Sequence, residues 1–253
     1  MQDYSDGPGA QVYAPKMGAP PAVILSPHLD DAVLSCWHLL SGPGDVRVIN
    51  VYAGTPAPGS GTSWWDRETG ATDSAVRMAE RRAEDREAFA VAGRTATHLD
   101  FLDEQYEPGG RSVEEIALAL RELIEPEAVV YAPAALGEHG DHERVRGAAL
   151  ELAATGQPVR LYADYPHAAR LGWPSWVTTT QAGPGVAEHW DRRLGEVGLS
   201  NPRPQVHHLA AAEQQRKLRA LSAYRTQMPT LASMFGEIEG FPAFPDEIVW
   251  SLS

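Results

Sequence analysis

Two short segments, far apart in the chain, combine histidine with aspartate in a way that suits metal-dependent hydrolysis. The first is HLDD at residues 28–31, and the second is HGDH at residues 139–142. Imidazole and carboxylate are ordinary ligands of catalytic zinc, whose usual site has three protein ligands and an open position for water. If the two segments meet, they supply enough ligands for such a site.

Each segment follows a predicted strand and precedes a predicted helix. Residues 22–26 (AVILS) lead into HLDD, and residues 128–133 (AVVYAP) precede the loop that carries HGDH. In open α/β sheets, ligands bind outside the carboxyl ends of the strands. Because both loops follow strands, we expect them to face one another at the same edge of the sheet.

Helix capping explains only part of this pattern. An aspartate before a helix is a common N-cap, and acidic residues suit the first helical turn. That accounts for the aspartates of both segments. It leaves three histidines in two matched loops unexplained, since a charged imidazole is disfavoured at a helix N-terminus. The histidines therefore favour a metal site.

We assign His28, Asp31 and His142 as the metal ligands, because two imidazoles and one carboxylate form a common open catalytic zinc set. Asp30 would then accept a proton from the attacking water. His139 would stabilise the developing oxyanion or protonate the leaving group.

Asp141 is expected to orient a ligand imidazole. The spacing alone does not fix how the roles are divided among these six residues. Zinc (Zn²⁺) is the expected metal, and Fe²⁺ or another divalent ion is compatible with the same ligands.

Short apolar runs alternate with helical patterns along the chain, which predicts an α/β fold with a mainly parallel sheet and helices on both faces. We expect a single domain over residues 22–253, after a flexible N-terminal tail at residues 1–21. Residues 53–73 are interpreted as a loop, residues 166–204 as irregular, and residues after 224 as a C-terminal tail. Further strands are expected at 45–53, 97–102, 159–165 and 205–210, and helices at 74–93, 112–126, 142–156 and 212–224.

Composition narrows the class of protein. The 253 residues carry 21 basic and 34 acidic side chains, a net charge of −13, and no basic cluster. This argues against a surface for nucleic acid or anionic membranes. The one cysteine, Cys36, excludes an intrachain disulfide and fits a reducing compartment. No apolar run approaches the ~20 residues that span a bilayer. A soluble, cytoplasmic protein is expected.

The sequence resembles the PIG-L/LmbE-type zinc N-deacetylases, whose motifs are His-Pro-Asp-Asp and His-x-Asp-His. Three further stretches agree in order with that family. RRAEDREAFAVAG (81–93) looks like its Arg-x-x-Glu helix, HLDFLDEQY (98–106) like its third strand and acidic loop, and KLRALSAYRTQMP (217–229) like its late Lys–Tyr–Gln helix. The resemblance runs from about residue 22 to residue 230.

This resemblance implies a Rossmann-like, LmbE-like sheet and removal of an acyl group, usually acetyl, from the nitrogen of an amino sugar or related glycoside. It implies the ligand set given above, Asp30 as general base and His139 at the oxyanion. Leu29 and Gly140 stand where the family often has proline, so we expect altered loop stiffness with the chemistry retained. The family's eukaryotic membrane helix is missing, which argues against a membrane-embedded glycolipid substrate.

Loops after the second and third strands also reach the predicted crevice. An indole offers an apolar face to a sugar ring, and charged side chains bind hydroxyl groups. His167, after the fifth strand, is expected to be an exposed loop residue. We predict substrate contacts from Trp65, Asp66, Arg67, Asp103 and Tyr106.

Three alternatives to a deacetylase of amino sugars stay open. One is an amidase acting on a non-sugar or thiol-conjugate amide. Another is a non-haem iron oxygenase, which also uses two histidines and one carboxylate but usually on an all-β barrel. The third is a carbohydrate-binding protein with a vestigial site, which has no need of Asp30 or His139. The expected partner is a small N-acylated molecule, and a homo-oligomer is compatible with the sequence.

Overall fold

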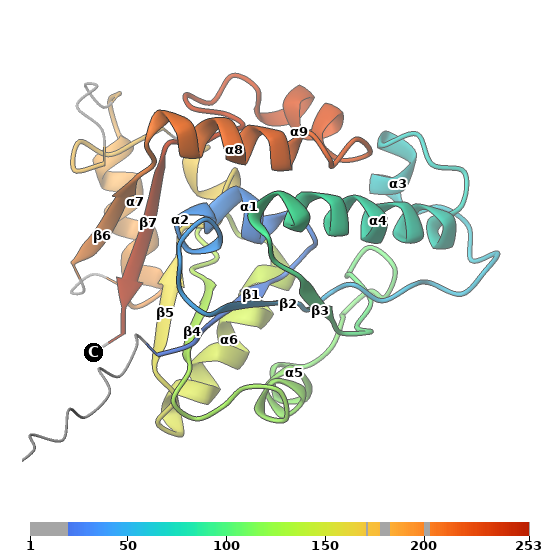
Figure 1. The fold of residues 1–253 in the computed structure, drawn as a ribbon, viewed down its shortest axis with the longest axis horizontal. Helices are drawn as coiled ribbons and strands as arrows, with labels where there is room; N and C mark the ends of the chain where they lie inside the picture. The colour runs from blue at the N-terminus through green and yellow to red at the C-terminus, as the bar shows by residue number, and fades with distance from the viewer. Residues whose placement is uncertain (1–19, 171, 178–182, 200–202, 253) are drawn as a thin grey trace, which may run out of the picture.

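The computed structural model describes residues 20–170, 172–177, 183–199 and 203–252, so nearly all of the tail predicted at residues 1–21 lies outside the described residues. Within the described residues, one mixed sheet has the strand order β3-β2-β1-β4-β5-β7-β6 (Figure 1). The strands are β1 (Ala22–Ser26), β2 (Val46–Asn50), β3 (Ala96–His98), β4 (Val129–Pro133), β5 (Val159–Tyr162), β6 (Pro204–His208) and β7 (Asp246–Ser251).

The five strands from β3 to β5 are parallel, in the 3-2-1-4-5 order of doubly wound folds. β7 runs antiparallel to both β5 and β6. The predicted fold class is therefore confirmed. The order of the strands reverses between β1 and β4, and this switch point is where such folds bind their ligands. It is also where HLDD and HGDH leave the sheet.

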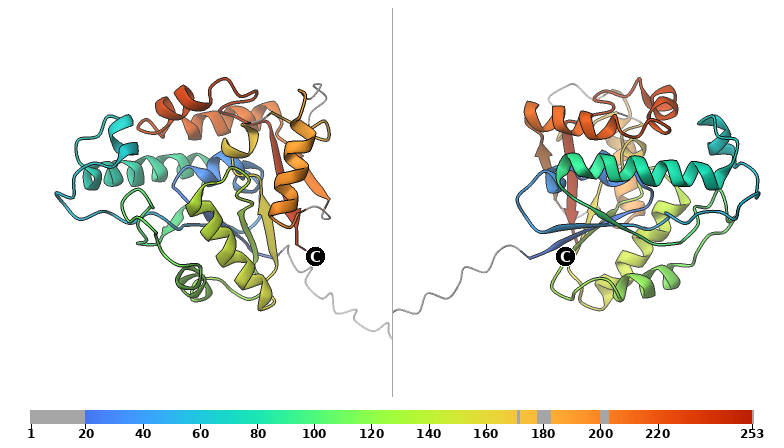
Figure 2. Two further views of the ribbon diagram at one scale, coloured as in Figure 1. Left: turned by 180° about the vertical axis from the view of Figure 1, so that it is seen from behind. Right: turned by 45° about the vertical axis from the view of Figure 1, so that its right-hand side comes forward.

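Two layers of helices cover the sheet. α4 and α8 pack together with α1 and α2 on one face, and α5 packs with α6 on the other (Figures 1 and 2). No helix in the described part of the chain has the length and apolar character needed to cross a membrane. The helices are α1 (Asp31–Ser35), α2 (Trp37–Leu40), α3 (Trp64–Glu68), α4 (Ser74–Ala92), α5 (Val113–Arg121), α6 (Gly140–Ala154), η1 (His167–Ala169), α7 (Val186–Glu196), α8 (Ala211–Leu221) and α9 (Met228–Phe235).

Local sequence signals explain where the predicted helices begin and end. The Asp73 side chain accepts a hydrogen bond from the backbone N–H of Val76 and caps α4, which ends at Gly93 in the left-handed conformation. Ser112 and Glu115 form a capping box at the start of α5. Cys36 is buried.

Five elements lie where none was predicted. α3 interrupts the expected loop at 53–73, and η1 and α7 lie within the segment expected to be irregular. The tail contains α9 and β7, and β7 is an inner strand of the sheet. These predictions were wrong because short elements among prolines and glycines give weak periodicity, and their burial against the rest of the fold decides their conformation.

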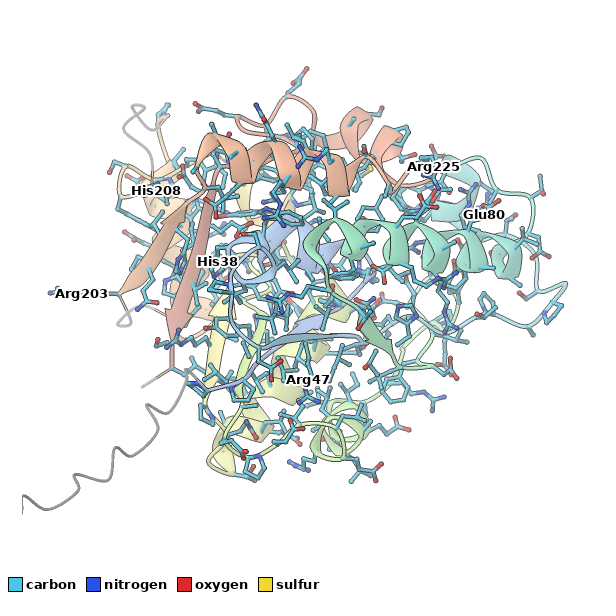
Figure 3. The ribbon with its side chains drawn as sticks, in the orientation of Figure 1. His38, Arg47, Glu80, Arg203, His208 and Arg225 are labelled. Atoms are coloured by element: carbon cyan, nitrogen blue, oxygen red, sulfur yellow. The ribbon has the colours of Figure 1, made fainter. Side chains whose placement is uncertain are left out.

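A buried ion pair ties the late elements of the chain to the early ones. The Nζ atom of Lys217 on α8 lies 2.7 Å from Oε1 of Glu247 on β7, and both side chains are fully buried. Nδ1 of His38, on α2 (Figure 3), lies 2.7 Å from the other Glu247 oxygen. Burial raises the pKa of Glu247, but Lys217 and His38 outweigh it and hold that pKa at about 2.

Replacing Glu247 with glutamine should lower the free energy of unfolding by about 3–5 kcal/mol at neutral pH, because Lys217 then stays buried without an opposite charge. The depressed pKa of Glu247 means that its contribution is present above its ordinary pKa of 4.5 and is lost as pH falls toward 2. Urea unfolding across this range should therefore show a shallower acid dependence for Glu247→Gln than for the wild type.

The exposed pair between Glu87 and Arg225, of which Figure 3 labels Arg225, provides the control. Surface pairs of this kind contribute little, so Glu87→Gln should leave the unfolding midpoint nearly unchanged at every pH. Equal effects of the two substitutions would contradict the role given to Glu247.

Candidate active site

The loop after β1 is held by its own short side chains. The Ser26 hydroxyl donates to the carbonyl of His28 and accepts from the backbone N–H of Ala32. The backbone N–H of His28 donates to Oδ2 of Asp31 at 2.8 Å. Leu29 packs against Ala53 and Met78, so the residue that replaces the family's proline anchors the loop by apolar contact.

The loop after β4 is strained and is clamped from outside. Ala135 and Glu138 have positive φ values of 54° and 61°, which cost side-chain-bearing residues about 1–3 kcal/mol each. Arg193 on α7 donates from Nε to the carbonyl of Leu136 at 3.0 Å and from Nη2 to that of Ala135 at 3.3 Å. These bonds hold the loop in the conformation that precedes His139.

The two loops meet around the carboxylate of Asp31. Its Oδ2 atom lies 3.3 Å from Nδ1 of His28 and 3.3 Å from Nε2 of His142. The ring centroids of the two histidines are 5.3 Å apart. Segments more than a hundred residues apart in sequence therefore converge at one point, as the strand order requires.

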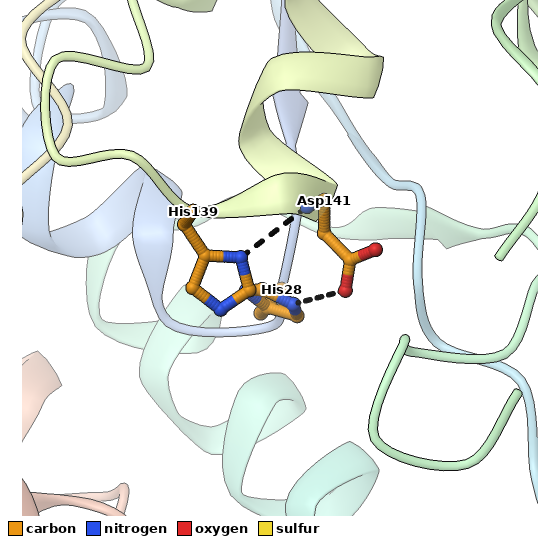
Figure 4. Close-up of side chains that lie close together, drawn as sticks. All are labelled: His28, His139 and Asp141. Atoms are coloured by element: carbon orange, nitrogen blue, oxygen red, sulfur yellow. Dashed lines mark hydrogen bonds and ion pairs between the residues drawn. The ribbon is translucent and has the colours of Figure 1, made fainter. Parts of the chain in front are cut away.

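A buried carboxylate orients each of these two imidazoles. Nε2 of His28 lies 3.2 Å from Oδ2 of Asp141 (Figure 4), and Nδ1 of His142 lies 3.1 Å from Oδ2 of Asp164. Each carboxylate favours a proton on the nitrogen that it faces, so the other nitrogen of each ring, which faces Asp31, is the one that can give up its proton to a metal ion. Nε2 of His142 is buried and has no hydrogen-bond partner among the described residues, as a metal ligand requires.

Donor atoms of His28, Asp31 and His142 lie within 4.8 Å of one another, and so do those of His28, His139 and Asp141. The first set fits a divalent ion better, because the second set is already engaged. Asp141 accepts from His28, from Arg144 and from a backbone N–H, and its own N–H donates to Nδ1 of His139 (Figure 4).

Charge at the site favours a bound cation. Burial lowers the pKa of His142, but Asp31 and Asp164 outweigh it and raise that pKa to about 9. Burial also lowers the pKa of His28. Asp103, Asp141 and Asp31 outweigh burial and raise that pKa well above its ordinary value. A divalent ion would satisfy the same carboxylates that hold these protons.

His139 behaves differently from the other two histidines. Burial, followed by repulsion from His28 and His142, lowers its pKa to about 3. It is therefore neutral near pH 7. Because Nδ1 accepts the N–H of Asp141, the ring proton belongs on Nε2, which makes His139 a hydrogen-bond donor through that atom.

Asp30 lies beside the cluster without joining it. Burial and the neighbouring Asp31 carboxylate raise its pKa, and Arg81 partly offsets that rise. The Arg81 side chain is buried, yet its Nε and Nη1 atoms have no hydrogen-bond partner. Both residues line a cavity of about 440 Å³.

That cavity contains only some of the residues predicted to contact substrate. Trp65 and Asp103 line it, whereas Asp66, Arg67 and Tyr106 do not. Asp66 is buried and accepts a hydrogen bond from the Tyr106 hydroxyl at 2.9 Å. Arg67 donates to the carbonyl of Thr62. The structure thus does not bring these three predicted residues to the cavity.

Sequence reasoning missed Asp164 and wrongly expected His167 to be exposed. His167 is partly buried and lines the cavity, and desolvation lowers its pKa to about 4. A Cβ atom at residue 137 would lie only 2.1 Å from the Cβ atom of His167, so glycine is required at that position. Asp164 and His167 both follow β5. Ligands bind outside the carboxyl ends of the strands, and this rule, which identified the two motifs, applies to these two residues as well.

The fold and site together define a class of α/β proteins with a histidine–carboxylate centre at the switch point of a parallel sheet. The profile of the PIG-L family, GlcNAc-PI de-N-acetylase, matches residues 23–153. The chain belongs to this family. A search of curated protein sequences finds no match.

Solved structures of deacetylases resemble the whole described fold. A deacetylase triple mutant from the teicoplanin biosynthetic pathway has a TM-score of 0.70 and 25% identity, covering 91% of this chain and 97% of that one. The A40926 pseudoaglycone deacetylase has a TM-score of 0.69 and 26% identity, covering 92% and 97%.

Replacing Asp164 with asparagine is expected to weaken metal binding by about 10–100-fold. The backbone N–H of Leu136 donates to Oδ1 of Asp164 and would keep the amide oxygen on that side. The amide N–H would then face Nδ1 of His142 and force the proton onto Nε2, the nitrogen that should bind the ion. Calorimetric zinc titration should measure this loss, with the exposed Asp45→Asn as control.

Proposed function

We propose that the protein is a metal-dependent N-deacylase that removes an acyl group, most simply acetyl, from the nitrogen of an amino sugar in a glycoside or related conjugate. One observation carries this proposal: the unpartnered Nε2 of His142 converges with His28 and Asp31 beside a cavity that also contains Asp30. Membership in a de-N-acetylase family and the likeness to two deacetylases support the same reaction.

We infer that His28, Asp31 and His142 hold the metal, and zinc is the ion that their donor atoms fit best. A divalent ion held by these three residues would supply Lewis-acid chemistry, which polarises a carbonyl oxygen and makes water more acidic. Asp141 and Asp164 keep the two ligand imidazoles in the required tautomers.

Asp30 is our candidate for the general base. It lines the cavity next to the proposed ligands, and no hydrogen bond from the described part of the chain commits its carboxylate to another side chain. Burial raises its pKa, which brings it closer to that of an effective base at neutral pH. Arg81 keeps the carboxylate ionised.

His139 is our candidate for stabilising the oxyanion. Its low pKa, about 3, suits a neutral hydrogen-bond donor better than an acid that delivers a proton. Its Nε2–H would donate to the carbonyl oxygen of the amide as negative charge develops there. The amine that leaves would take its proton from Asp30, which received it from water.

Replacing Asp30 with asparagine should reduce kcat by about 10²–10⁴-fold, because the amide keeps the shape but accepts no proton. Zinc content after dialysis should match that of the wild type, since Asp30 is not one of the proposed ligands. Release of acetate and free amine from N-acetylated glycosides measures the first effect. Near-normal turnover in a zinc-loaded Asp30→Asn enzyme would remove Asp30 from the mechanism.

A further inference from the structure

We propose that the group attached to the amino sugar is an uncharged, apolar aglycone that binds to a wall formed by Trp64, Leu231, Met234 and Phe235. This inference rests on the proposed function and adds the class of substrate. All four side chains line the same cavity as Asp30 and His139. Trp64 lies on α3, and the other three residues lie on α9.

The wall exposes large apolar side chains that gain from being covered. Trp64 is 58% exposed and Met234 is 52% exposed, although both are large hydrophobic residues. Leu231 and Phe235 are buried and form the base on which these two side chains stand. Exposed apolar side chains at the edge of a pocket are typical of a binding surface. Contact with an apolar ligand would remove this area from water and stabilise the complex.

The wall is a built structure that spans two helices. Nε1 of Trp65 on α3 donates to Oε1 of Gln227, just before α9, at 2.7 Å. The hydroxyl of Thr230 on α9 donates to the carbonyl of Glu68 on α3 at 3.3 Å. These bonds fix the two helices side by side, so the apolar wall is present before any ligand arrives.

The polar and apolar parts of the cavity are separate. The floor carries the histidine–aspartate cluster and Arg81, whereas the wall carries indole, thioether, phenyl and aliphatic groups. A ligand that matches both parts has a polar sugar amide at one end and an apolar group at the other. A second groove of about 580 Å³ shares Met234 and Phe235 with the cavity, but it is also lined by Arg170 and Glu237, so we place the apolar group against the wall and not in that groove.

The charges of the lining argue against a phosphate-bearing substrate. Among the described residues that line the cavity, Arg81 is the one with a permanent positive charge, and it faces Asp30. Asp103 and Glu104 add negative charge, and the whole chain carries −13. Recognition of phosphate needs arginine or lysine donors. None of the four wall residues is one, and Arg170, whose Cζ lies 5.7 Å from the centre of the Phe235 ring, lines the second groove and not this cavity.

Three probes that share one sugar test this inference: the methyl glycoside, the octyl glycoside and the 1-phosphate of N-acetylglucosamine, with octyl glycoside kept below its micelle-forming range. The zinc-loaded enzyme should bind the octyl glycoside at least about tenfold more tightly than the methyl glycoside in calorimetry. Its kcat/KM for acetate release should follow the same order, with the 1-phosphate lowest.

Matched substitutions then locate the effect. Met234→Ser and Trp64→Ala should each reduce the preference for octyl over methyl glycoside by about three- to tenfold. Leu118→Ser provides the control, because Leu118 is 60% exposed on α5 and does not line the cavity. It should leave both the binding ratio and the kcat/KM ratio unchanged.

The two readouts keep this inference separate from the proposed function. Equal affinity for octyl and methyl glycosides, tighter binding of the 1-phosphate, or a preference that survives Met234→Ser and Trp64→Ala would overturn the apolar aglycone, even if acetate is released. Tighter octyl binding without acetate release from any probe would support the wall and count against deacetylation of this sugar.

Discussion

The site depends on two imidazoles that are each fixed from behind by a buried carboxylate. Asp141 holds His28 and Asp164 holds His142, so that the second ring nitrogen of each histidine faces Asp31. A histidine free to rotate would offer a metal either nitrogen and would lose entropy on binding. Here that entropy is lost during folding, which leaves a rigid set of donors at the end of the sheet.

Much of the fold serves to keep these donors in place. The strained turn after β4 persists because Arg193 on α7 binds the carbonyls of Leu136 and Ala135. The loop after β1 is fixed by the Tyr224 hydroxyl, which lies 3.0 Å from the carbonyl of Leu29. Elements that are remote in sequence thus oppose the tendency of two short loops to relax, at a cost of about 1–3 kcal/mol for each strained residue.

The sequence was sufficient to predict the parallel part of the sheet and the meeting of the two motifs. Periodic apolar strands and capped helices such as α4 and α5 carry their own signals. β7 and α7 do not, because their apolar residues gain burial only once the rest of the sheet has formed. At the site, residue types and strand order suggest which side chains gather.

What spacing does not determine is which partner each side chain chooses. Asp66 was expected to face a ligand but is buried against Tyr106, and His167 was expected in solvent but packs beside Gly137. Small differences in the distance between two loops decide such contacts, and residue spacing does not determine that distance. The roles assigned to the ligands and to Asp30 stay predictions, although the geometry makes them specific.

The antiparallel strand β7 also affects when the centre can form. The backbone N–H of Ala163, next to Asp164, donates to the carbonyl of Ile248 on β7 at 3.0 Å. During synthesis on the ribosome, both histidine motifs emerge long before that strand does. The nascent protein therefore carries all the proposed ligands while one imidazole still lacks its fixed orientation, and full affinity for the ion should arise only after β7 has been synthesised and has paired with β5.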